Sequence, residues 1–253
     1  MSTLSARGLG GLPEIRPGDD LAQLIVAALG THAPRAGQIV AIAHTVVSKA
    51  EGAVVRLSDV TPSERALALA DEQGRDARAI QVVLDESAEV LREARGVLIC
   101  RTRHGFVCAN AGVDASNSGG GDETLIVLPR DPDRSAREIR ARLGELIGAT
   151  PPAVLITDSF GRAWRHGQVD VAIGAAGMAP LDDWRGRSDA DGLELRATWL
   201  AVADAVAATA DMARAKDSCE PVVIVEGLER FCTIEDGPGA PALLRSLDED
   251  LFR

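Results

Sequence analysis

The chain has 253 residues, 46% of them apolar and 26% charged, a composition typical of a soluble globular protein and unlike that of a disordered chain, a fibre or a disulfide-rich miniprotein. Lys and Arg number 27 against 38 Asp and Glu, and the resulting formal charge of −11 argues against binding to nucleic acid or to an anionic membrane. The four cysteines lack metal-binding spacing, and the sequence contains neither a signal peptide nor a membrane-spanning apolar run, so we expect free thiols and a cytoplasmic protein.

Hydrophobic periodicity predicts helices and short strands interleaved along the whole chain, with no obvious linker. This pattern is typical of an α/β (mixed α+β) fold, and we expect residues 1–253 to form one unit with at most two subdomains. In chain order we expect a helix over 21–29, a strand over 39–43, helices over 63–73 and 76–95, a hairpin of 97–100 with 106–109, a strand over 125–128, a helix over 131–147, strands over 154–157 and 169–173, a helix over 195–215 and a strand over 222–225.

Capping and turn residues refine this outline. Thr61 to Glu64 has the form of a capping box with Pro62 at the first helical position. The strand over 154–157 is expected to run into a polar loop. Residues 182–192 are rich in Asp, Gly and Arg, and they are the best candidate for a mobile loop.

Polar clusters follow the predicted strands, where loops held by a rigid scaffold commonly carry function. The cluster at 110–117 contains Asp114, and the cluster at 157–162 contains Asp158 beside Ser159. A carboxylate next to a hydroxyl at a strand's carboxyl end suits a Mg²⁺ or Mn²⁺ ion that also touches phosphate. The residues alone leave simpler alternatives open, namely a local turn at Asp114 and a helix cap at Asp158.

Several cations near these clusters are candidates for binding an anionic ligand. Arg162 and Arg165 offer planar donors to phosphate or carboxylate groups, and Asp170 is expected to pair with Arg165. Lys49 is one of two lysines in the chain and suits a phosphate contact, with an ordinary surface lysine as the alternative. His166 is interpreted as a solvated turn residue.

Familiar nucleotide and hydrolase signatures are missing from the chain. It contains no GxxxxGK[ST], no dinucleotide fingerprint after a strand, no GxSxG and no HExxH. The residues by themselves therefore predict an α/β protein with a candidate acidic metal site, and they do not name a reaction.

Five motifs taken together carry a resemblance to a known family. They are Gly11–Ile15, Val46–Gly52, Asn110–Asn117, Ile156–Arg165 and Gly167–Gly174, and they occur in that order. The set resembles the coenzyme F420-0:L-glutamate ligase (gamma-glutamyl ligase) family, including the amino-terminal half of the two-domain mycobacterial form, over about residues 8–230. We expect no nitroreductase-like second domain, because the chain ends at Arg253.

The resemblance implies a GTP-dependent ligase that joins L-glutamate to the terminal carboxylate of the deazaflavin precursor F420-0 and can add further glutamates through γ-linkages. A carboxylate is a poor electrophile, so the implied route passes through an acyl phosphate. The resemblance also implies Mg²⁺ or Mn²⁺ as the divalent metal, K⁺ as an activator and an intertwined homodimer.

The family's functional positions fall on particular residues of this sequence. Asp114 and Asp158 match ligands of one divalent metal, and Ser159 matches a ligand of a second. Catalytic roles are expected for Asp114, Asp158, Arg162 and Arg165, with an arginine or Lys49 stabilising the developing charge. The nucleotide-binding positions implied by the resemblance are Leu12, Pro13, Glu14, Ile15, His44, Thr45, Lys49, Asn117 and Lys216.

The chain departs from the family pattern at three points: Ala215 stands where the family has Gly, Glu226 where it has Arg, and His44 where small polar residues are common. His44 and Glu226 favour an alternative, a paralogue that ligates an amino acid to another carboxylate metabolite. A non-catalytic nucleotide-binding relative is a second alternative, and the intact Asp114 and Asp158 argue against it.

Overall fold

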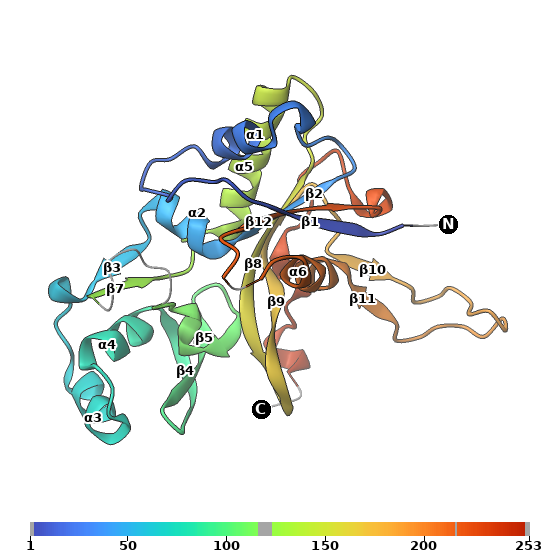
Figure 1. Ribbon diagram of the computed structural model, residues 1–253. Coiled ribbons are helices and arrows are strands. Elements are labelled where there is room, and N and C mark those ends of the chain that lie inside the picture. Colours follow the sequence, from blue (N-terminus) through green and yellow to red (C-terminus); the bar gives the residue numbers. More distant parts are fainter. Residues whose placement is uncertain (1–2, 116–122, 216, 251–253) are drawn as a thin grey trace.

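A five-stranded sheet forms the centre of the computed structural model, which describes residues 3–115, 123–215 and 217–250 (Figure 1). The strand order is β1-β12-β2-β8-β9; β2 and β8 are parallel, and the other neighbours are antiparallel. The carboxyl end of β2 therefore lies beside Thr157, about halfway along β8. The strands are β1 (Ser5–Leu9), β2 (Ile39–Ala43), β8 (Ala153–Arg162), β9 (Arg165–Ala176) and β12 (Val222–Glu226).

Helices cover both faces of this sheet, because alternate residues of its strands point to opposite sides. In β2, Val40 and Ile42 pack with α1 (Leu21–Leu29) and α5 (Pro132–Ile147), whereas Ile39 and Ala41 pack with α6 (Val202–Ala213). Gly174 of β9 allows α5 to approach closely, since a Cβ there would lie 2.4 Å from the Pro132 carbonyl oxygen. The predicted helices over 21–29 and 131–147 are confirmed, as is the buried strand over 39–43.

A smaller region of short elements follows α2 (His44–Glu51), which begins directly after β2. It has its own apolar cores, one built around Ile80, Leu98 and Cys100. β6 pairs with β5, as the predicted hairpin requires, and it lies against β8 of the central sheet. The elements of this region are β3 (Val54–Arg56), α3 (Glu64–Gln73), α4 (Ala77–Asp85), β4 (Ser87–Ala94), β5 (Val97–Thr102), β6 (Val107–Ala109) and β7 (Thr124–Ile126).

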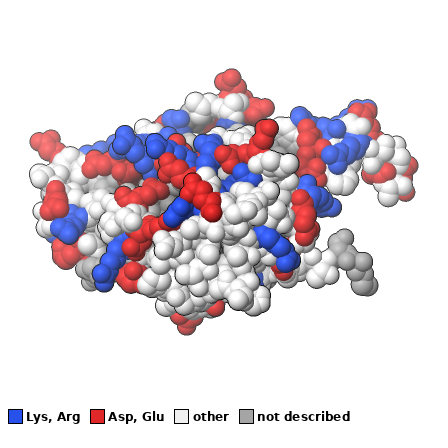
Figure 2. Space-filling model, turned by 90° about the horizontal axis from the view of Figure 1, so that it is seen from above, with Lys and Arg blue, Asp and Glu red and all other residues white. Residues whose placement is uncertain are grey.

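A hairpin arm formed by β10 (Leu181–Asp183) and β11 (Trp199–Ala201) projects from the body of the molecule (Figure 1). Residues 182–192, expected as a mobile loop, belong to this arm. Its backbone pairing continues beyond the strands, since Leu195 N donates to Arg187 O at 2.8 Å. On the face seen in Figure 2, acidic and basic side chains are interspersed.

The predicted helix over 76–95 is wrong in its second half. α4 ends at Asp85, where the Ser87 hydroxyl donates to the Val83 carbonyl at 2.6 Å, and residues 87–94 form β4. β4 pairs along its length with β5, the strand that follows it after the turn at Arg95 and Gly96, so pairing with this neighbour decides the conformation of a segment whose own pattern favours a helix.

Two other helix starts differ from expectation. Ser63 is the N-cap of α3, because its hydroxyl accepts from Ala66 N at 3.3 Å, so Thr61 and Pro62 precede the helix. α6 begins at Val202 because residues 195–201 complete the hairpin arm. Within the described parts of the chain, no helix combines the length and the apolar character needed to cross a membrane.

Candidate functional site

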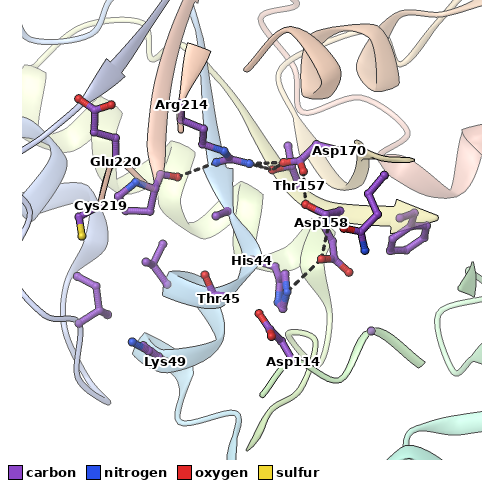
Figure 3. A pocket seen from close by; sticks show the side chains of 18 of the residues that line it. His44, Thr45, Lys49, Asp114, Thr157, Asp158, Asp170, Arg214, Cys219 and Glu220 are labelled. Atoms are coloured by element: carbon purple, nitrogen blue, oxygen red, sulfur yellow. Dashed lines mark hydrogen bonds and ion pairs between the residues drawn. The ribbon is translucent and has the colours of Figure 1, made fainter. Parts of the chain in front are cut away.

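A cavity of about 730 Å³ opens at the carboxyl end of β2 and beside the second half of β8 (Figure 3). The loop 12–15, the amino-terminal turn of α2, residues 108–114, the ribbon formed by β8 and β9, and the segment 214–221 contribute its described walls. The fold thus brings together the chain segments that hold the expected nucleotide and metal residues, except those outside the described parts. Asn117 and Lys216 lie outside the described residues.

Asp158 lies on a strand, so the expected polar loop and the helix-cap alternative are both wrong. β8 continues to Arg162 because it pairs with β9 along its whole length. Asp158 accepts from Ser159 N at 2.7 Å, and its Oδ1 lies 3.3 Å from Nε2 of His44. His44 is the first residue of α2 and is 3% exposed, so this departure from the family pattern contacts the expected metal ligand directly.

Asp114 enters the same cavity from the smaller region. Its backbone forms an isolated bridge with Ile126, with N–O distances of 2.9 and 2.8 Å, and this pairing fixes its place beside the central sheet. In Figure 3, Asp114, Asp158 and His44 face one part of the cavity. The two carboxylates that the sequence separates by 44 positions therefore line one site.

Asp170 and Arg214 form a buried ion pair in the cavity wall (Figure 3). Asp170, 1% exposed, also accepts from the hydroxyls of Thr157 at 2.8 Å and Ser159 at 2.6 Å. Arg214 donates through Nη1 to the Pro221 carbonyl at 3.2 Å, and so ties together both ends of the segment 214–221.

The expected pairing of Asp170 with Arg165 is wrong. Asp170 faces Ser159 across the two strands, whereas Arg165 faces Arg162 near the hairpin tip. The strand pattern gives no sign that Asp170 is buried, because Val169, Val171 and Ile173 occupy the opposite phase, although a carboxylate that is buried requires a cation or several hydrogen bonds. Nothing in the sequence indicates that Arg214, at the end of α6, supplies it.

Lys49 points into the cavity from α2 and is 9% exposed, so the surface-lysine alternative is wrong. Its Nζ donates to Glu14 Oε1 at 2.6 Å. This contact joins α2 to the loop 12–15 that the resemblance assigns to nucleotide binding.

Two expected catalytic residues and one departure from the family lie elsewhere. Arg162 and Arg165 are exposed at the tip of the β8–β9 hairpin and do not line the cavity. Glu226 is at the far end of β12 from the cavity, where it accepts from Gln38 Nε2 at 2.5 Å and pairs with Arg35. Glu226 therefore gives no support to an altered acceptor.

The described lining of the cavity is acidic. Lys49 and Arg214 are its basic residues, and each is paired with a carboxylate. A polyanionic ligand would therefore need to bind in this cavity together with metal cations that offset the negative charge. The acidic lining residues are Glu14, Asp114, Asp158, Asp170, Asp217 and Glu220.

The donor set fits a hard divalent cation held partly by its ligand. Asp114, Asp158 and Ser159 offer carboxylate and hydroxyl oxygens in one cavity. The described residues contain no group of three or more His, Cys, Asp or Glu arranged to hold a metal. Mg²⁺ is commonly bound in this way, by one or two carboxylates together with substrate phosphates and water.

Cys108 and Cys219 both line the cavity but differ in environment. Burial, together with the negative charge of Asp158, raises the pKa of Cys108 to about 12, whereas Cys219 is exposed. At pH 8 the fraction of Cys108 present as thiolate is about a thousandfold smaller than that of a cysteine with the ordinary pKa. The thiolate is the form that reacts. We therefore expect iodoacetamide to modify Cys219 at least about a hundredfold faster than Cys108.

Peptide mass spectrometry over a time course measures both rates in one sample. Labelling in urea is the control, because unfolding removes the burial and should make the rates similar. Equal rates in the native protein would contradict the described environment of Cys108.

Taken together, the fold and the cavity define an α/β protein with a ligand site at the carboxyl end of a parallel strand pair, lined by hard oxygen donors and a buried lysine. The family follows from the sequence: the model of the family described as F420-0:gamma-glutamyl ligase matches residues 11–227. The chain belongs to this family.

Three relatives match the chain over nearly its whole length, and each is called coenzyme F420:L-glutamate ligase. The relative from Methanopyrus kandleri is 45% identical and covers 97% of this chain and 100% of its own. The relative from Methanothermobacter thermautotrophicus is 42% identical, with 99% of each chain covered. The relative from Halobacterium salinarum is also 42% identical and covers 99% of this chain and 96% of its own.

Proposed function

We propose that this protein is a GTP-dependent ligase that joins L-glutamate to the terminal carboxylate of F420-0 in the biosynthesis of coenzyme F420. Membership of the family and the names of the relatives support the glutamate ligation. The observation that carries the proposal is the convergence of Asp114, Asp158, Ser159 and Lys49 in one cavity beside the loop 12–15.

The proposed reaction has two chemical steps. The acceptor carboxylate attacks the γ-phosphorus of GTP, which forms an acyl phosphate and releases GDP. The amine of glutamate then attacks the acyl carbon, phosphate leaves, the amine proton is lost to solvent or a base, and an amide bond remains. Phosphoryl transfer of this kind depends on positioning and charge stabilisation more than on a protein nucleophile.

The described residues divide this work. Lys49 would bind a nucleotide phosphate, and its ion pair with Glu14 holds its ammonium group at the loop 12–15. Asp114 and Asp158 would hold one Mg²⁺ or Mn²⁺ ion and Ser159 would contribute to a second, and such ions supply positive charge to the phosphate oxygens. Such charge is needed because the cavity lining is acidic.

We also propose that the protein acts as a homodimer. Support comes from the hairpin arm, which carries Leu193, Trp199 and Leu200 with 68%, 50% and 45% of their surface exposed. Exposed apolar side chains gathered on a projecting element are typical of an interface between chains. Light scattering on the purified protein tests this assembly.

An end-point reaction tests the proposed function. Purified protein would be mixed with F420-0, GTP, glutamate and Mn²⁺, with and without K⁺, and the deazaflavin product and GDP would be measured together. We expect glutamate added in equal amount to the GDP released, with K⁺ raising the yield. GDP without a glutamylated deazaflavin would indicate another acceptor, and the absence of both products would indicate a nucleotide-binding relative without turnover.

A further inference from the structure

The β8–β9 hairpin projects beyond the sheet to which it belongs (Figure 1). β2 accompanies β8 only as far as Thr157, whereas β8 and β9 continue to pair with each other up to Arg162 and Arg165. Residues 158–171 therefore form a two-stranded ribbon that extends about 15 Å past the sheet. All residues from Gly161 to Gln168 are exposed.

The base of this ribbon is a wall of the cavity. Ser159, Phe160, Gly161 and Gln168 line the cavity, and Phe160 packs edge-on against Phe106 with ring centroids 6.2 Å apart. The hairpin tip, residues 162–165, follows directly after Gly161, the last residue of β8 that lines the cavity. A ligand whose reacting end lies beside Ser159 can therefore extend along the ribbon to the tip.

The tip combines an aromatic side chain with positive charge. Trp164 is 82% exposed and has a φ of 57°, a backbone conformation that a bulky residue adopts at an energetic cost and that Gly or Asn adopts readily. Arg162 and Arg165 are opposite each other in the ladder, and Arg162 donates to the His166 carbonyl at 2.6 Å. The tip thus presents an indole to solvent, with one arginine before it and one after it in the chain, and these side chains suit stacking on a planar ring and pairing with anionic groups.

We propose that this tip, defined by Arg162, Trp164 and Arg165, binds the acceptor's aromatic and anionic part outside the cavity, while the acceptor's terminal carboxylate reaches the cavity. This inference rests on the proposed function, in which the acceptor is a deazaflavin that is both planar and anionic. The indole would stack on the deazaflavin ring, and the guanidinium groups would pair with the acceptor's anionic groups. Charge complementarity supports this assignment, because the tip is basic whereas the described cavity lining is acidic.

The assignment also changes the role of two residues. Arg162 and Arg165 were expected to stabilise charge on the transferring phosphate, and their position at the tip suits recognition of the acceptor instead. Nucleotide binding should then be independent of the tip, which gives the test its selectivity.

The test measures binding of F420-0 to Trp164→Ala and Arg165→Gln by deazaflavin fluorescence, without GTP or turnover. We expect the Kd of each variant for F420-0 to rise about tenfold, with the Kd for GTP unchanged, and Trp164→Phe to retain most of the affinity. Leu67→Ala on α3 is the control, because it removes another exposed apolar side chain outside the cavity, the tip and the hairpin arm, and it should bind F420-0 like the wild type.

Three outcomes overturn the proposal. They are an unchanged Kd for F420-0 in Trp164→Ala, an equal weakening of F420-0 and GTP binding, and a loss of affinity that follows dissociation of an oligomer in light scattering. Because binding is measured without catalysis, a protein that binds F420-0 through the tip but makes no product would contradict the proposed function and leave this inference standing.

Discussion

Asp158→Asn is expected to lower the turnover of the ligase reaction by about a hundredfold while leaving the fold intact. Asp158 lies on β8, and its backbone pairing with Val171 does not depend on the side chain's charge. Asn retains the size of the side chain and an oxygen that can accept from Ser159 N. The variant therefore removes one negative charge from the proposed metal site with little change in shape.

The measurement pairs steady-state turnover with Mn²⁺ binding in the presence of GTP. Asp71→Asn is the control, because Asp71 is an exposed carboxylate on α3 outside the cavity lining. His44→Ala distinguishes the contact of Asp158 with His44 from its proposed contact with the metal, since this variant removes the imidazole and keeps the carboxylate. Wild-type turnover in Asp158→Asn, with an unchanged Mn²⁺ requirement, would contradict the metal role.

Local signals in the sequence were sufficient where one element determines its own structure. The apolar stripe of α1, the buried run of β2 and the Asp131–Pro132 start of α5 each carry their information within a few residues, and all were predicted. Residues 87–94 could not be predicted, because their conformation depends on pairing with β5. The same holds for residues 157–162, which form a strand because β9 returns beside them.

The candidate site shows the same division. The ordered motifs placed the loop 12–15, Lys49, Asp114 and Asp158 in one site, and the cavity contains all of them. The same motifs suggested a phosphate role for Arg162 and Arg165. The motifs do not show that these two arginines lie at the end of the β8–β9 ribbon, outside the cavity. Arg214 was missed because its partners Thr157 and Asp170 lie on strands distant in the sequence.

Breaking the Asp170–Arg214 pair is expected to destabilise the protein by about 3–5 kcal/mol, the range found when one partner of a buried ion pair is removed. Asp170→Asn leaves the Arg214 guanidinium, 11% exposed, without a compensating charge. Arg214→Met leaves the Asp170 carboxylate with the hydroxyls of Thr157 and Ser159 as its described partners. Urea unfolding of each variant measures the change in the free energy of unfolding.

The double variant Asp170→Asn/Arg214→Met distinguishes an unpaired charge from a general loss of packing. Because it contains neither charge, we expect it to recover more than half of the stability that either single variant loses. Asp183→Asn is the matched control: Asp183 pairs with Arg185 at 2.8 Å, but both side chains are about half exposed, so solvent replaces the contact and stability should change little. If the losses of the single variants instead add up in the double variant, the two side chains contribute independently and the ion pair has no coupling energy.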